Sequence, residues 1–137
     1  MGYTHYFQLD RAVTQQEWDS FTKGVLQLRE SAWEIAIDGT ITPDYIDING
    51  VGEDSHENLV IQRENTRWSF CKTARKEYDA LVTAILILAH YTFPNFYLSS
   101  DGDWDDWKNG RDLFGHTFNL IAAEGSVFGN SKFKELV

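Results

Sequence analysis

Hydrophobic and polar positions alternate at the start of the chain and then change to a helical spacing. Residues 2–9 alternate in a way that predicts a β-strand with two unlike faces. One face would carry Tyr3, His5, Phe7 and Leu9, and the other Thr4, Tyr6 and Gln8. Thr14 and Glu17 then match a capping box at the start of a helix. Apolar residues recur behind them every three or four positions: Trp18, Phe21, Val25, Leu28, Ala32 and Ile35. This spacing predicts a helix that runs to about Ile37 and stops at Gly39.

The rest of the chain predicts shorter strands, two more helices and a hairpin. Asn49-Gly50 is typical of a hairpin turn, and Pro94 ends a strongly apolar helix. That helix has little polar face, so we expect it at the centre of the fold. The expected elements are strands over 45–48, 59–62, 68–71 and 96–98, and helices from about Ala74 or Tyr78 to His90 and over 104–118. This order predicts one α+β domain over residues 1–137, a mostly antiparallel sheet with about three helices, one of them central and buried.

Composition narrows the class of protein. The longest apolar run, residues 81–89, is too short to span a membrane, and no Lys/Arg-led apolar segment predicts a signal peptide. A single cysteine, Cys71, fits a reducing compartment, so we expect a cytoplasmic protein. Zinc, dinucleotide and phosphate-loop motifs are missing from the sequence, and we assign no metal, cofactor or catalytic residue. The chain has 21 acidic and 12 basic side chains, and its net charge of −9 argues against binding to a nucleic-acid duplex.

The cations of this acidic chain are concentrated in one part of it. Residues 63–76, here called the basic segment, hold Arg63, Arg67, Lys72, Arg75 and Lys76 with a single acid, Glu64. The segment therefore carries about +4, and the rest of the chain about −13. It would end at a strand-to-helix junction, where backbone amides and cations can hold a phosphate. The expected anion contacts are Lys72, Thr73, Arg75 and Lys76. The alternatives are a solvated surface paired with acids elsewhere, or a contact for an acidic protein.

Two short segments resemble a family of small phage- and prophage-encoded proteins. They are Met1-Gly2-Tyr3-Thr4-His5-Tyr6 and Phe70-Cys71-Lys72-Thr73-Ala74-Arg75-Lys76, the second followed by Tyr78-Asp79. The family often has a proline where this chain has Glu77. The resemblance implies an accessory protein that acts in the bacterial host cytoplasm, of a kind that often counters host defence. It also favours Tyr3, Thr4, His5 and Tyr6 as contacts for a nucleobase or a ribose, and adds Tyr78 to the candidate ligand contacts.

Two histidines and the cysteine have both a structural and a chemical interpretation. His5 is either a half-buried histidine with satisfied hydrogen bonds or a ligand contact. His56 and Glu57 are either part of an ordinary loop or an acid–base pair that joins the candidate site. Cys71, although close to cations, is expected in the core rather than as a reactive thiolate.

The acidic stretch near the C-terminus also has two interpretations. The acids between Asp101 and Asp112 imitate part of a calcium-binding loop, but the glycine and the final glutamate of such a loop are missing. Capping of the following helix explains them with fewer assumptions. Trp104 and Trp107 lie three residues apart, and we expect them to pack in the core.

Three functions are compatible with these features. We favour a counter-defence protein that sequesters a small phosphorylated, nucleotide-like ligand without changing it. The second is an acidic inhibitor, of anti-CRISPR or anti-nuclease type, that imitates nucleic acid and blocks a basic host protein. The third is a nucleotide phosphodiesterase, with His5 or His56 as acid–base and with Lys72 and Arg75 on the phosphoryl group. None of the three needs a membrane, and a pocket between subunits would make a homo-oligomer natural.

Overall fold

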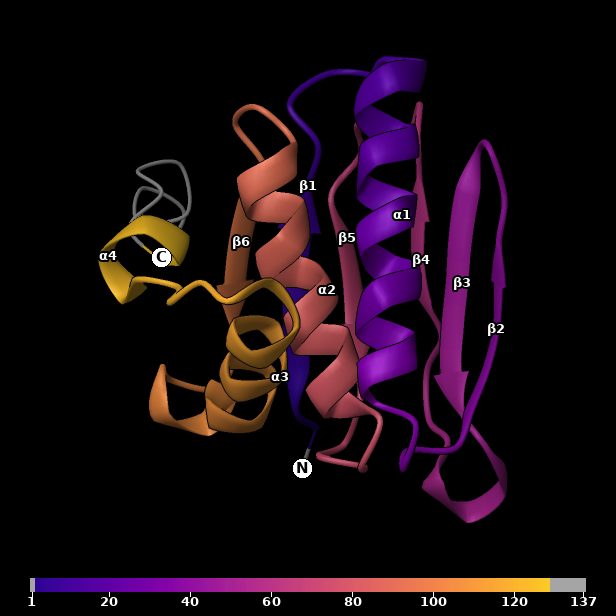
Figure 1. The fold of residues 1–137 in the computed structure, drawn as a ribbon, viewed down its shortest axis with the longest axis vertical. Coiled ribbons are helices and arrows are strands. Elements are labelled where there is room, and N and C mark those ends of the chain that lie inside the picture. Colours follow the sequence, from indigo (N-terminus) through magenta and orange to yellow (C-terminus); the bar gives the residue numbers. More distant parts are fainter. Residues whose placement is uncertain (1, 129–137) are drawn as a thin grey trace.

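One layer of strands and one layer of helices make up the fold (Figure 1). The computed structural model describes residues 2–128, so Met1 of the first resembling segment and the end of the chain lie outside the described residues. The strands are β1 (Thr4–Gln8), β2 (Ile37–Ile41), β3 (Tyr45–Gly50), β4 (Leu59–Gln62), β5 (Ser69–Lys72) and β6 (Tyr97–Ser100). The helices are α1 (Gln15–Ser31), α2 (Asp79–Thr92), α3 (Lys108–Phe118) and α4 (Glu124–Val127), with short 3-10 helices η1 (Gly52–Asp54) and η2 (Asp105–Trp107). The expected α+β class is confirmed.

The strands form two antiparallel sheets of three strands each, in the orders β5-β1-β6 and β2-β3-β4. β4 lies beside β5, so the two sheets continue each other in one layer (Figure 1). α1, α2 and α3 lie on the same face of this layer, with α2 between the other two. β1 is the middle strand of its sheet, where His5 pairs with Cys71 on one side and with Ser100 on the other.

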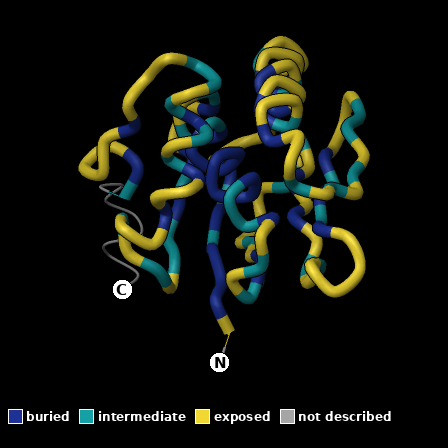
Figure 2. Tube along the Cα trace, turned by 60° about the horizontal axis from the view of Figure 1, so that its bottom comes forward, coloured by how far each residue is buried: buried dark blue, intermediate teal, exposed yellow. Residues whose placement is uncertain are grey.

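The core lies between the helices and the strands, as the apolar pattern predicts. Tyr3, His5 and Phe7 are buried beneath the helices, whereas Tyr6 and Gln8 on the other face of β1 are partly exposed. Every residue of α2 from Leu81 to Ile87 is buried, which confirms the central helix; Figure 2 shows the buried trace at the middle of the molecule. Although α2 is strongly apolar, none of the helices within residues 2–128 combines the length and the apolar character needed to cross a membrane.

The start of α1 is confirmed in detail. Thr14 Oγ1 accepts a hydrogen bond from the Glu17 amide at 3.1 Å, and the Glu17 carboxylate accepts one from the Thr14 amide at 2.9 Å. These two bonds form the predicted capping box. Trp18, in the first turn, donates from its indole nitrogen to the Thr42 carbonyl at 2.8 Å, so the beginning of α1 is held against the β2–β3 turn.

The end of α1 was predicted wrongly. The helix ends at Ser31, and Ile37 begins β2, which pairs with β3. Gly39 does not stop a helix but lies within β2 opposite Ile48, where a Cβ atom would come within 2.6 Å of the Ile48 Cδ1 atom. The last two apolar residues of the pattern, Ala32 and Ile35, therefore lie in the connection between α1 and β2, because Ile37 pairs with a neighbouring strand and does not continue the helix.

Asn49-Gly50 is not a hairpin turn, because both residues belong to β3. Asn49 instead holds the longer connection over residues 51–58: its Nδ2 donates to the His56 carbonyl and its Oδ1 accepts from the His56 amide, both at 3.1 Å. The return strand β4 lies where the sequence predicts it. The two strands are thus joined by a longer connection that the Asn49 side chain holds by hydrogen bonds, and not by a tight turn.

The junction between β5 and α2 also differs from the expectation. α2 begins at Asp79, so the basic residues precede the helix and do not occupy its first turn. Ala74 and Arg75 have positive φ angles of 53° and 59°. This region costs a residue other than glycine about 1–2 kcal/mol. The cations therefore lie on a strained turn, and the acidic Asp79 takes the helix start, as the helix dipole favours.

Candidate ligand-binding groove

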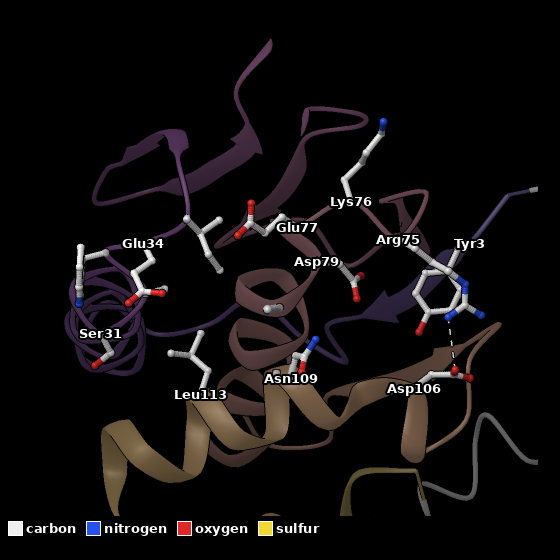
Figure 3. A pocket seen from close by; sticks show the side chains of 15 residues that line it. Tyr3, Ser31, Glu34, Arg75, Lys76, Glu77, Asp79, Asp106, Asn109 and Leu113 are labelled. Carbon is white, nitrogen blue, oxygen red and sulfur yellow. Dashed lines mark hydrogen bonds and ion pairs between the residues drawn. The ribbon is translucent and has the colours of Figure 1, made fainter. Parts of the chain in front are cut away.

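A cavity of about 560 Å³ opens between the end of α1, the turn over residues 73–78 and the start of α3 (Figure 3). Its volume lies within the range of about 300–1,000 Å³ that is usual for small-molecule sites. We call it the groove. Its lining includes the hydroxyl group of Tyr3 and the charged side chains of Glu34, Arg75, Lys76, Glu77, Asp79 and Asp106.

Arg75 lies over the ring of Tyr3 at one end of the groove (Figure 3). Its guanidinium carbon is 4.0 Å from the ring centroid, and its Nη1 atom is 3.3 Å from Asp106 Oδ1. Asp106 also accepts a hydrogen bond from the Asp103 amide at 2.9 Å. That bond, followed by Arg75, lowers the pKa of Asp106. The Arg75 side chain remains 60% exposed, so it can meet a ligand.

A chain of hydrogen bonds runs beneath this end of the groove. His5 Nδ1 is 2.7 Å from Ser100 Oγ, and His5 Nε2 is 2.6 Å from Asp79 Oδ1. Thr73 donates from its hydroxyl to the same Asp79 oxygen at 2.7 Å. His5 and Thr73 are fully buried, whereas the Asp79 side chain is 16% exposed and lines the groove.

The hydrogen bonds around Ser100 and His5 determine which of their atoms carry hydrogens. Ser100 Oγ accepts from the Gly102 amide at 3.0 Å and from the Trp107 indole at 3.1 Å. A hydroxyl has two lone pairs, so its own hydrogen is left for His5 Nδ1, and Nε2 of His5 donates to Asp79. Ser100, His5 and Asp79 are linked by hydrogen bonds in the order found in a catalytic triad. Both lone pairs of the serine oxygen already accept hydrogen bonds, however, and the histidine is buried. The hydrogen bonds between Ser100, His5 and Asp79 therefore have a structural role and hold the Asp79 side chain in place.

Tyr3 is only 4% exposed, and its buried hydroxyl has no hydrogen-bond partner among the residues that the structure describes. Burial raises the pKa of this hydroxyl to about 12, the carboxylates of Asp79 and Asp106 add to the rise, and Arg75 opposes it. The group therefore stays protonated at neutral pH and can donate a hydrogen bond.

The groove is not the uniformly positive pocket that the basic segment suggests. It has four carboxylates, from Glu34, Glu77, Asp79 and Asp106, and two cations, from Arg75 and Lys76. The basic segment is also divided, because Arg63 and Arg67 lie beyond the opposite end of β5. Arg63 donates to the Val13 carbonyl at 2.9 Å and to Glu64 at 2.8 Å. Only the end of the segment thus contributes to the groove.

Three of the expected ligand contacts are engaged in the fold outside the groove. Thr4 is 6% exposed and its amide donates to Asp101 Oδ2 at 3.1 Å. Tyr6, on the opposite face of β1, donates to Asp101 Oδ1 at 2.9 Å. Tyr78 is fully buried and donates to the Glu57 carbonyl at 2.5 Å. These residues hold strand ends and loops together and do not line the groove.

The remaining expected contacts also lie apart from the groove lining. Lys72 is partly exposed beside Gly2, and its amide donates to Glu57 Oε1 at 2.9 Å. His56 is exposed on the 51–58 connection. His5 is buried, and neither histidine of the phosphodiesterase hypothesis, His5 or His56, is among the described residues that line the groove. Of the ten expected contacts, those that line the groove are Tyr3, Arg75 and Lys76.

Sequence reasoning missed the groove residues that come from other elements: Trp33, Asp79, Asp106 and Asn109. One of them had a signal. Trp33 falls off the buried face of the α1 pattern and is 78% exposed, and a large aromatic at an exposed position is a candidate binding residue. Asp79 follows the second resembling segment and Asp106 lies in the acidic stretch, but neither had a signal that pointed to the groove, because they reach it only through the tertiary fold.

The structure also gives the surroundings of the cysteine, of the two tryptophans and of the acidic stretch that the sequence analysis considered. Cys71 is fully buried as expected, and burial raises its pKa to about 12, so it is not a thiolate. Trp107 is fully buried and Trp104 partly so. Within residues 2–128, no group of three or more His, Cys, Asp or Glu side chains is arranged to hold a metal. Asp106 and Asp103 instead bond each other's amides at the start of η2.

Comparisons of the chain with protein-family models, with curated proteins and with solved structures returned no match. Function therefore has to be argued from the groove.

Proposed function

We propose that the protein binds a small phosphorylated, nucleotide-like ligand in the groove and sequesters it without chemical change. The observation that carries this proposal is the position of Arg75, which stands 60% exposed over the buried Tyr3 ring at the mouth of a ligand-sized cavity. Arginine pairs with phosphate oxygens through two parallel hydrogen bonds, and Lys76 adds a second positive charge. The ion pair with Asp106 is exposed and therefore weak, so a phosphate can displace or share it.

Backbone strain supports a functional role for the Arg75 turn. Two consecutive residues with positive φ are unfavourable for folding, and such strain is concentrated at binding and catalytic sites. Glycine at position 74 or 75 would relieve the strain of that one residue. The turn places Arg75 and Lys76 beside a cavity, which is a reason for a chain to keep an unfavourable conformation.

Trp33 also lines the groove and supplies a surface for the base. It is 78% exposed and lies in the segment that follows α1. Stacking of a nucleobase on an aromatic side chain contributes about 1–3 kcal/mol and tolerates different bases. A ligand that contacts both residues would thus use charge at Arg75 and stacking at Trp33.

Calorimetric titration with a panel of nucleoside monophosphates and cyclic mononucleotides tests the proposal. We expect binding to the wild type and a loss of about 10- to 100-fold with Arg75→Ala, since a hydrogen bond to a charged group contributes about 1.5–3 kcal/mol. Arg67→Ala is the matched control, because it removes the same charge from the basic segment outside the groove. Equal losses in the two variants, or no binding across the panel, would overturn the proposal.

Sequestration is separated from catalysis by the fate of the ligand. Ligand released by denaturing the complex should be chemically unchanged in mass and chromatographic retention. A cleaved product would instead indicate turnover. In a phage-infected host, such a protein would act by mass action as a counter-defence accessory, removing a nucleotide signal from its receptor.

The charge distribution favours a second candidate, an acidic inhibitor that imitates nucleic acid. The division of the basic segment and the four groove carboxylates leave a surface dominated by acids. Such a surface would bind a basic host protein rapidly and with strong dependence on salt. Binding that weakens steeply with ionic strength and is unaffected by Arg75→Ala would favour this candidate over the first.

A further inference from the structure

The side chain of Asp79 presents one free oxygen to the groove. Its Oδ1 atom accepts from both His5 and Thr73, at 2.6 and 2.7 Å, whereas no described residue donates to its Oδ2 atom. The carboxylate is held rigidly by these two bonds from β1 and from the 73–78 turn. Because the side chain lines the groove and is 16% exposed, the free oxygen is an oriented acceptor for a ligand.

The hydroxyl of Tyr3 is the nearby donor. It is buried and unpartnered, and Figure 3 shows it directed into the same end of the groove as Asp79. Ser100 lies close to it but cannot serve it: both lone pairs of Ser100 Oγ accept from Gly102 and Trp107, and its hydrogen goes to His5. A buried hydroxyl without a partner is costly for folding, and a ligand group would satisfy it.

An acceptor and a donor at one end of a groove fit a group that both donates and accepts. An ammonium group only donates and a carbonyl only accepts, whereas a hydroxyl does both. We infer that Asp79 and Tyr3 hold the 2′-hydroxyl of the ligand's ribose, so that the groove selects ribose over 2′-deoxyribose. Carboxylates bind the ribose 2′-hydroxyl in this way at dinucleotide sites. The inference rests on the proposed function, because Arg75 and Lys76 would hold the phosphate of the same molecule.

Titration of the wild type with adenosine 5′-monophosphate and with its 2′-deoxy analogue tests the inference without any variant. We expect the ribonucleotide to bind about tenfold more tightly, as the loss of one hydrogen bond to a carboxylate predicts. Equal affinity for the two would overturn the inference and leave the proposed function standing. No binding of either, nor of ribose 5-phosphate, would overturn both.

Asp79→Asn tests the assignment of the acceptor. Asparagine keeps an oxygen for His5 and Thr73 and replaces only the free Oδ2 with an NH₂ group, so the support of the side chain is retained. We expect the preference for ribose to fall to within about twofold. Glu77→Gln removes the same charge from the groove and should keep the preference. A preference retained in Asp79→Asn, or lost equally in Glu77→Gln, would contradict the assignment.

Tyr3→Phe, which retains the ring under Arg75, tests the assignment of the donor. It should weaken binding of the ribonucleotide more than binding of its deoxy analogue.

Discussion

His5 Nε2 lies 2.6 Å from Asp79 Oδ1, so a buried side chain of β1 is bonded to the first residue of α2. This bond links the two segments that the sequence singles out, the N-terminal strand and the residues that follow the basic segment. It explains why a histidine lies among apolar side chains on the buried face of β1. It also gives Asp79 a fixed orientation beside the groove.

Asp79→Ala should destabilise the fold far more than Asp79→Asn. Alanine leaves the imidazole of His5 and the hydroxyl of Thr73 buried without an acceptor, at a cost of about 1–3 kcal/mol each. We therefore expect a loss of about 2–6 kcal/mol in the free energy of unfolding for alanine. Asparagine retains an acceptor and should cost much less. Denaturant titration checks this, and equal losses in the two variants would show that the bonds do not support the fold.

Gly110→Ala should separate α2 from α3. A Cβ atom at this buried position would overlap the hydroxyl of Thr83 on α2, which is itself bonded to the Asp79 carbonyl at 2.9 Å. Overpacking of this kind costs about 1–3 kcal/mol. Gly125→Ala is the control, because a Cβ atom there would meet no atom of residues 2–128 within 4 Å. Thermal unfolding of both variants compares them; a neutral Gly110→Ala would contradict the close approach of the two helices.

The capping box should make stability depend on pH in the acid range. The bonds from Arg11 and then from Thr14 lower the pKa of Glu17 from its ordinary value of 4.5 to about 2. The ionised form therefore contributes fully above pH 4.5, and its contribution is lost as the pH falls towards 2. The difference in Tm between wild type and Glu17→Gln should be largest at neutral pH and shrink across this window. A difference that stays constant from pH 6 to pH 2 would contradict the assignment.

Cys71 should be unreactive in the folded protein. Its thiol is fully buried, and burial raises its pKa to about 12, so the thiolate is negligible at pH 8. A disulfide reagent at that pH should label the thiol only after unfolding in denaturant. Rapid labelling of the native protein would mean that β5 opens to solvent.

The sequence predicts the elements whose stability is local. The alternation in residues 2–9, the reciprocal bonds of Thr14 and Glu17 and the apolar face of α1 depend on neighbours in the chain, and all three are present. The central position of α2 also follows from its sequence, because a helix without a polar face has to be buried on every side.

The elements that depend on distant partners are not predictable in this way. The helical spacing continues to Ile35, yet α1 ends at Ser31 and residues 37–41 form β2, because β3 offers them backbone partners. Ala74 and Arg75 adopt positive φ against their intrinsic preference. The groove joins Tyr3, Trp33, Arg75 and Asp106, and only the fold brings these separate segments together. A charge count along the chain consequently locates Arg75 but not the carboxylates opposite to it.

The conformation of Ala74 has a consequence for the evolution and engineering of the protein. Glycine would adopt its φ of 53° without strain, so Ala74→Gly should make the folded state more durable. The same change would give the turn more freedom and let Arg75 leave the ring of Tyr3. A library selected only for heat resistance would therefore be expected to accumulate glycine here, whereas one selected for recognition would keep alanine. The residue at position 74 would thus indicate whether a given variant was selected for stability or for ligand binding.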